Sequence, residues 1–206
     1  MADPLARLQR VRHSNAWIFG AMLFFAALSL IASFVLSLDA IELAKDPEAN
    51  LSCNINSVIS CGTVGTSWQA EAFGFPNAFL GLIATPVIIT LAVAGLGGAR
   101  FPRWFMLGVQ LFYTGALGFA YWLFYQSMFN IGALSPWCLV VTTSTTLVFV
   151  ALAHLNIRDN NLFLPTRVQD TLASAVRANV DLVLVVIWLL VLALAILMKY
   201  GNALFG

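Results

Sequence analysis

Five stretches of this chain are each long and apolar enough to cross a lipid bilayer, and they constrain its fold more than any other feature. A helix rises about 1.5 Å per residue and the hydrocarbon core is about 30 Å thick, so each crossing needs roughly 20 apolar residues. The chain is 61% hydrophobic and 9% charged, which excludes an ordinary soluble domain and argues against nucleic acid as a partner. We therefore predict an all-α integral membrane protein, with a four-helix transmembrane bundle and a fifth transmembrane helix. The predicted spans are 16–38, 77–96, 104–129, 136–155 and 180–200.

The arginines indicate which ends of the spans face the cytoplasm, because short cytoplasmic loops are rich in Lys and Arg. Arginines precede the first span, separate the second span from the third, and separate the fourth from the fifth. The segment 39–76 is acidic apart from Lys45, and the segment around Ile131 is uncharged, so both are predicted to lie outside, as is the tail after Lys199. The N-terminus is then cytoplasmic. The arginines concerned are Arg7, Arg10, Arg12, Arg100, Arg103, Arg158, Arg167 and Arg177.

This orientation places the three cysteines outside and the two histidines on the cytoplasmic side. Cys53 and Cys61 lie in the first outer segment, and Cys138 lies at the outer end of the fourth span. All three therefore face an oxidising compartment. His13 and His154 cannot serve as acid or base for chemistry on the outer side.

The outer segment 39–76 is predicted to lie over the mouth of the bundle. Thr66 and Gln69 have the spacing of a capping box, and the residues after them are mostly apolar and aromatic. This pattern predicts a short amphipathic half-helix that Gly74 and Pro76 end before the second span. The alternative is a loop that dips into the lipid headgroups on its aromatic side chains.

The tetrapeptide at the head of the fourth span combines helix-starting residues with a cysteine. Ser135 is a preferred N-cap and Pro136 suits the first helical position, which puts Cys138 in the first turn. Free N–H groups and the helix dipole favour a thiolate there, which is the nucleophile in disulfide exchange and an electron donor to a quinone. The alternative is that Cys138 is simply a small buried hydrophobe.

The other two cysteines are close enough in sequence to form a disulfide. The segment 54–60 between Cys53 and Cys61 is flexible enough to bring their Cα atoms within the roughly 7 Å that a disulfide requires. Such a bond is either a redox-active pair or a structural staple on an exposed loop, and the spacing does not distinguish them. Because three is an odd number, one thiol stays free or pairs elsewhere.

Four short motifs occur together in the chain. They are Cys53 and Cys61 at their spacing, Ser67-Trp68, Phe73-Gly74-Phe75-Pro76-Asn77-Ala78-Phe79-Leu80-Gly81 leading into the second span, and Pro136-Trp137-Cys138. In this combination they resemble the vitamin K epoxide reductase family, and look most like its bacterial members that form disulfides. The resemblance covers roughly the first four spans and implies a catalytic core at 1–156 with the outer loop over its active site. Residues 157–179 are then a cytoplasmic loop, and 180–206 the fifth helix and a short outer tail.

Ser135 is the main departure from the family pattern. The fourth span of the family begins with a Cys-x-x-Cys pair, and Cys138 matches its second member while Ser135 stands at the first. Quinone reduction takes two electrons, which a dithiol supplies by closing to a disulfide. A serine cannot form that disulfide. We interpret Ser135 as an engineered replacement that traps one state; a natural inactive or rewired member is the alternative. Either way, we expect this chain to be impaired in turnover.

The resemblance implies a relay of electrons from a protein dithiol to a quinone, either menaquinone or ubiquinone. A separate thioredoxin-like extracytoplasmic partner reduces the Cys53–Cys61 disulfide and leaves oxidised. In family members with both helix cysteines, the loop pair then reduces the disulfide between them, and the thiolate matching Cys138 passes electrons to the quinone. Each transfer passes through a mixed disulfide, so Cys61 must move between Cys53 and position 135, and the loop must be mobile.

The resemblance also implies a quinone site, without any metal. Asn77 would hydrogen-bond a quinone carbonyl, and the alternative is that it caps the second span. Ser67 matches a family serine near the active site, with a capping role again the alternative. Thr142 stands where some members carry a tyrosine one turn after the reactive cysteine. The expected pocket walls, aromatic residues that are common at membrane interfaces in any case, are Trp68, Phe112, Tyr113 and Trp137.

The fifth span places the C-terminus outside, where certain bacterial relatives carry a fused thioredoxin-like domain. This chain ends at Gly206, so we expect the redox partner to be a separate protein. A fifth span without such a fusion is typical of an actinobacterial enzyme that uses menaquinone. We expect a multi-pass protein of the bacterial inner (plasma) membrane.

Two other functions stay open on the sequence. A vitamin K epoxide reductase in the strict sense shares the fold and differs in its oxidised substrate. A small transporter or channel with a stapled outer loop, or a structural protein with an incidental disulfide, belongs to a different class. Transport sites usually need ionisable groups or broken helices at mid-membrane depth, and no Asp, Glu, Lys or Arg lies centrally in any predicted span.

Overall fold

The computed structural model describes residues 11–205, which form helices and no β-strand. Five of these helices are long and apolar enough to cross a membrane. The chain is therefore an all-α, multi-pass membrane protein, as the sequence predicts. Arg7 and Arg10, which contribute to the predicted orientation, lie outside the described residues. The five helices are α2 (Asn15–Lys45), α4 (Ala78–Leu96), α5 (Arg103–Gln126), α6 (Pro136–Arg158) and α8 (Val180–Phe205).

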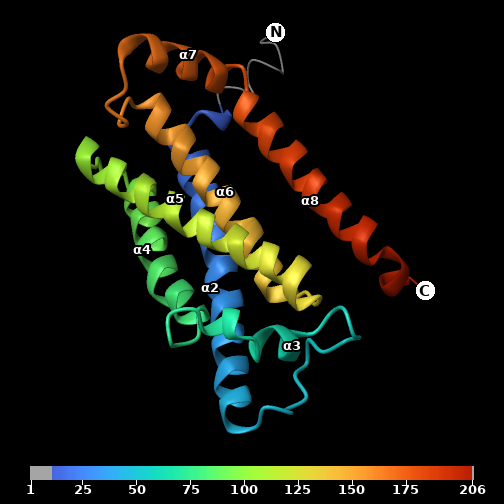
Figure 1. Ribbon diagram of the computed structural model, residues 1–206. Helices are drawn as coiled ribbons and strands as arrows, with labels where there is room; N and C mark the ends of the chain where they lie inside the picture. The colour runs from blue at the N-terminus through green and yellow to red at the C-terminus, as the bar shows by residue number, and fades with distance from the viewer. Residues whose placement is uncertain (1–10, 206) are drawn as a thin grey trace.

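Four of the spanning helices form a bundle, and α8 lies beside it (Figure 1). Helix α2 runs through the middle and packs against both α4 and α6, while α5 packs against α6. This is the predicted four-helix core with a fifth helix. The buried apolar side chains of the bundle core are Ile18, Phe19, Met22, Ala26, Ile88, Leu91, Ala92, Met106, Tyr113, Val148, Leu152 and Leu155.

Two of the helices differ from the predicted spans at the end that carries the cysteines. Helix α2 continues to Lys45, well past the predicted end at residue 38, because residues 39–45 favour helix and Leu43 is buried against the loop. Helix α5 continues into a π-helical turn, η2 (Ser127–Ile131), which ends where Gly132 adopts a φ of 77°. Asp39 therefore lies on a helix and not in the following loop.

Residues 157–179 are not a plain loop, because they contain helix α7 (Thr166–Arg177). Val168, Leu172 and Val176 recur every four residues along it and so share one face. Val176 on this face is buried. The amphipathic spacing is the sequence feature that indicates this helix.

The segment between α2 and α4 forms two short helical pieces instead of a single half-helix. They are α3 (Cys61–Gly65) and the 3-10 helix η1 (Trp68–Glu71). The predicted capping box is wrong, because the Thr66 hydroxyl donates to the Gly62 carbonyl over 2.9 Å at the end of α3 and does not cap the turn that contains Gln69. The segment lies across one end of the bundle, as predicted (Figure 1).

Hydrogen bonds hold α8 against the bundle at both ends and near its middle. Each joins a side chain of α8 to another part of the chain, so the fifth helix is attached to the core in spite of its large lipid-exposed surface. The contacts are Arg12 Nη2 and His154 Nδ1 to Asp181 Oδ2 (2.8 and 2.7 Å), Trp188 Nε1 to Tyr121 Oη (2.7 Å), and Tyr200 Oη to the Met128 carbonyl (2.9 Å).

Helices α2 and α4 approach closely at Gly81. A Cβ atom at this position would lie 2.1 Å from Ser33 Oγ and 2.8 Å from Ser33 Cβ. Ser33 is itself only 1% exposed, so its side chain has little room to move. Any larger residue at position 81 must push the two helices apart.

We expect Gly81→Ala to lower the free energy of unfolding by about 1–3 kcal/mol, the usual effect of overpacking a tight contact. Gly108→Ala on α5 is the matched control, because a Cβ there meets nothing within 4 Å. Thermal unfolding of both variants in detergent measures the difference. Equal midpoints for the two variants would show that the α2–α4 contact tolerates a methyl group.

Candidate active site

Cys53 and Cys61 form a disulfide in the segment between α2 and α4, with Cα atoms 5.6 Å apart. The two residues are only 6% and 3% exposed and pack with Leu43 of α2 and with Leu51. The disulfide is therefore buried against the end of the bundle and does not sit on an exposed loop.

Side-chain caps hold the chain around Cys61 in place. The Asn54 Oδ1 accepts the Gly62 N–H over 2.9 Å and the Ser60 hydroxyl over 3.1 Å. The Ser60 Oγ also accepts the Thr63 N–H over 3.1 Å, which makes Ser60 the N-cap of α3. Cys61 is therefore the first residue of a capped helical turn.

Backbone pairing joins this loop to Leu134, which lies two residues before α6. The Ser60 N–H donates to the Leu134 carbonyl over 3.1 Å, and the Leu134 N–H donates to the Val58 carbonyl over 2.7 Å. Because Cys61 follows Ser60 and Ser135 follows Leu134, the pairing brings the two side chains together. The distance from Cys61 Sγ to Ser135 Oγ is 3.3 Å.

The head of α6 has the geometry that the sequence predicts. Ser135 is the N-cap, Pro136 opens the helix, and the Ser135 Oγ accepts the Cys138 N–H over 3.3 Å. Cys138 is a free, half-buried cysteine. The Thr142 hydroxyl donates to the Cys138 carbonyl over 2.9 Å, so its oxygen lies one turn below the thiol.

A cavity of about 890 Å³ adjoins the disulfide and the head of α6. Its walls come from α2, α4, α5 and α6 and from the segment that crosses the end of the bundle, and most of the lining side chains are apolar. The cavity brings together most of the residues that the sequence singles out. These are Cys61, Ser135, Cys138, Asn77, Ser67, Trp68, Phe112, Tyr113 and Thr142.

Asn77 and Ser67 make hydrogen bonds other than caps. The Asn77 Nδ2 donates to the Gln69 carbonyl over 2.6 Å, while its Oδ1 is buried without a hydrogen-bond partner in the described part of the chain. The Ser67 hydroxyl donates to the Val64 carbonyl over 2.6 Å. Neither side chain caps the helix that follows it.

The predicted aromatic walls occupy three different environments. Tyr113 lines the cavity from the buried bundle core, whereas Trp68 and Phe112 line it with most of their surface exposed, 68% and 59%. Trp137 is not among the residues that line the cavity and instead packs against the disulfide cluster. The aromatic residues therefore surround both the cavity and the disulfide.

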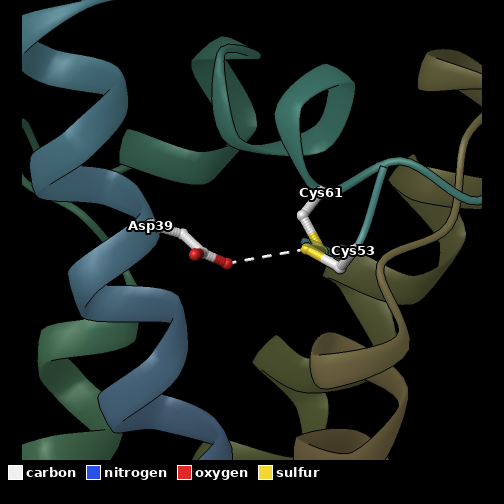
Figure 2. A group of neighbouring side chains, drawn as sticks. All are labelled: Asp39, Cys53 and Cys61. Atoms are coloured by element: carbon white, nitrogen blue, oxygen red, sulfur yellow. Dashed lines mark hydrogen bonds between the residues drawn. A yellow bond between two sulfur atoms is a disulfide. The ribbon is translucent and has the colours of Figure 1, made fainter. Parts of the chain in front are cut away.

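Asp39 is a residue of this site to which sequence reasoning assigned no role. Figure 2 shows its side chain reaching from α2 toward the disulfide, with Oδ2 3.6 Å from Cys53 Sγ. Asp39 also lines the cavity, together with Cys61 and Cys138. The only sequence feature that points to it is an acidic residue directly after a long apolar run.

The oxygen of Asp39 and the two disulfide sulfurs lie within 4.8 Å of one another, a spacing at which such atoms can hold a metal ion. Thiolates, and not disulfide sulfurs, are the cysteine ligands of metals. Because Cys53 and Cys61 are joined to each other, the oxidised group does not fit a metal.

The two histidines lie at the other end of the bundle, away from the cysteines. His13 Nδ1 and His154 Nε2 are 2.9 Å apart, and His154 also contacts Asp181 of α8. Burial, and then the adjacent His154, lower the pKa of His13 below its usual value. Because both histidines lie at the opposite end of the bundle, neither can act on the sulfur atoms.

A comparison with protein-family models matches residues 20–153 to the vitamin K epoxide reductase family. The match runs from α2 to α6 and includes every cysteine, whereas α8 lies beyond it. A search of curated proteins returns no match. Because the match covers well over half of the chain and contains the buried disulfide, the cavity and the head of α6, the chain belongs to the vitamin K epoxide reductase family.

Proposed function

We propose that this chain is a membrane thiol:quinone oxidoreductase of the type that forms disulfides in a protein partner and passes the electrons to a quinone. Family membership and five spanning helices make it a multi-pass membrane oxidoreductase. The observation that carries the finer proposal is the 3.3 Å approach of Cys61 Sγ to Ser135 Oγ, at the edge of a cavity that Cys138 also lines.

The relay begins at the loop disulfide. A thiolate of the partner attacks the Cys53–Cys61 bond, and its second thiol then closes the partner's own disulfide. The partner loses two electrons and two protons, which the loop cysteines gain. The loop thus becomes a dithiol whose Cys61 lies beside the head of α6.

The second exchange passes these electrons into the helix pair. In relatives with cysteines at both positions, Cys61 attacks the disulfide between positions 135 and 138, and Cys53 then resolves the mixed disulfide. The loop disulfide closes again and two thiols remain on α6. A quinone in the cavity accepts two electrons and two protons from that pair.

Ser135 stops this sequence in the present chain. Its hydroxyl occupies the place of the attacked sulfur and cannot form a disulfide, so electrons that enter the loop have no route to Cys138. We infer that Ser135 is an engineered replacement of a cysteine that traps one state of the relay; a natural, inactive or rewired member is the alternative.

The cavity fits a quinone by its size and its polar groups. Ligand pockets measure about 300–1,000 Å³, and this one is about 890 Å³ with mainly apolar walls. Asn77 donates one N–H to Gln69, so its second N–H is available to a quinone carbonyl. Its buried, unpartnered Oδ1 suits the hydroxyl of a reduced quinone. We propose menaquinone on the family resemblance, with ubiquinone as the alternative.

We propose that the disulfide faces the outside of a bacterial inner membrane. Arg12, Arg103 and Arg158 lie together at the opposite end, where Arg12 contacts Asp181, Arg158 contacts the His13 carbonyl and Arg103 lies near Asn160. This clustering supports a cytoplasmic location for that end. The proposed partner is a separate thioredoxin-like protein outside the membrane.

One prediction of the proposed function concerns position 135, which interrupts the relay. We expect Ser135→Cys to raise turnover from background, because a dithiol on α6 supplies the two electrons that quinone reduction needs. The measurement follows thiol loss from a reduced thioredoxin-like protein together with quinone absorbance, and two thiols are expected to be lost for each quinone that is reduced.

The matched control for this experiment is Cys138→Ala in the Ser135→Cys protein. Activity should return to background, and unchanged activity would refute the role of Cys138. Supplying vitamin K epoxide in place of the quinone distinguishes the two related activities. Turnover with the epoxide and none with quinone would favour a reductase in the strict sense.

Another prediction of the proposed function concerns quinone binding. In the Ser135→Cys background, we expect Asn77→Ala to raise the KM for quinone about tenfold, because one hydrogen bond contributes about 1–1.5 kcal/mol. Reduction of the loop disulfide by the partner should keep its rate. Asn202→Ala, which changes an exposed asparagine of α8, is the control. If both variants keep the parent KM, Asn77 does not contact the quinone.

A further inference from the structure

Asp39, which lines the cavity, forms a carboxyl–sulfur pair with Cys53. Figure 2 shows the two side chains facing each other. Asp39 projects from α2, whereas Cys53 belongs to the loop, and Oδ2 lies 3.6 Å from Sγ. While the disulfide is intact, Cys53 has no proton to share with the carboxylate. Once the disulfide opens, the same distance suits an S–H to carboxylate hydrogen bond.

No basic side chain neutralises Asp39 among residues 11–205, where the ion pairs are Arg12–Asp181, His154–Asp181 and Arg158–Asp159. No N–H or O–H donor of the described chain bonds its carboxyl group either, and Cys53 Sγ is the polar side-chain atom that approaches it. A thiolate at Cys53 would therefore face an uncompensated carboxylate. The repulsion between a carboxylate and a thiolate at this distance disfavours the doubly charged state, so Asp39 and Cys53 retain one proton between them.

We propose that Asp39 is the catalytic proton acceptor and donor for Cys53 in thiol–disulfide exchange at the loop. This inference rests on the proposed function for its biological setting, but its chemistry concerns the loop alone. Cys61 transfers electrons toward the head of α6, and Asp39 serves the other sulfur.

The proton moves as each bond of the loop breaks and forms. When the partner leaves Cys53, the electron pair of the broken mixed disulfide stays on Cys53 Sγ, and a proton comes to it through Asp39. In the Ser135→Cys protein, where Cys61 can form a mixed disulfide with position 135, Cys53 attacks that bond and Asp39 takes the S–H proton as the new S–S bond forms. The thiolate expelled from that mixed disulfide carries the electron pair away. Electrons and protons balance without any further reactant.

The test measures the pH dependence of Cys53 reactivity. The full chain is reduced with dithiothreitol in detergent, freed of reductant and pulsed with iodoacetamide over a range of pH, and alkylation of the Cys53 peptide is read by mass spectrometry. We expect Asp39→Asn to lower the pH of half-maximal alkylation by about one unit or more, because a neighbouring negative charge no longer opposes the thiolate.

Two variants separate this role from structural support. Asp39→Glu keeps the carboxyl group and should restore most of the parent profile. Glu42→Gln removes a charge from an exposed position of the same helix and should leave the profile unchanged. An unshifted profile for Asp39→Asn, or an equal shift for Glu42→Gln, would overturn the proposal.

The unmodified chain provides a second readout if Asp39→Asn does not fold. Its Cys53 should reach half-maximal alkylation above about pH 8.5, the value of an ordinary thiol. A midpoint below that value would contradict a carboxylate partner. None of these measurements involves a quinone, so a failed quinone assay of the Ser135→Cys protein would count against the proposed function and leave the Asp39 result standing.

Discussion

The contact between the disulfide loop and the head of α6 depends on two backbone hydrogen bonds, from Ser60 to Leu134 and from Leu134 to Val58. They join a loop of the N-terminal half of the chain to Leu134, two residues before α6. Because Cys61 and Ser135 each follow a member of this pairing, main-chain atoms set the contact between their side chains.

The residues of this pairing also pack against the fifth helix, α8. Val58 and Leu134 pack in one buried cluster with Met128 of η2 and Tyr200 of α8, and the Tyr200 hydroxyl bonds the Met128 carbonyl. Helix α8 lies outside the residues that match the family. It nevertheless supports the loop end of the bundle, so the family core and the added helix share one apolar contact beside the disulfide.

Features that depend on local sequence could be predicted, and features that depend on distant parts of the chain could not. The five spans follow from hydrophobic runs, and the cap at Ser135 follows from residues next to it. The capping box at Thr66 was wrong because that hydroxyl ends one helical turn instead of starting the next. The pairing at Leu134 and the approach of Asp39 to Cys53 join segments that no local pattern connects.

The most direct test of this account asks whether the sulfur of Cys61 can bond to the head of α6. A protein that carries Cys53→Ser, Ser135→Cys and Cys138→Ala leaves Cys61 and the introduced cysteine without any other cysteine partner. Disulfide mapping by mass spectrometry of the oxidised protein should find Cys61 joined to the cysteine introduced at position 135. Finding both cysteines free would contradict the arrangement on which the proposed relay depends.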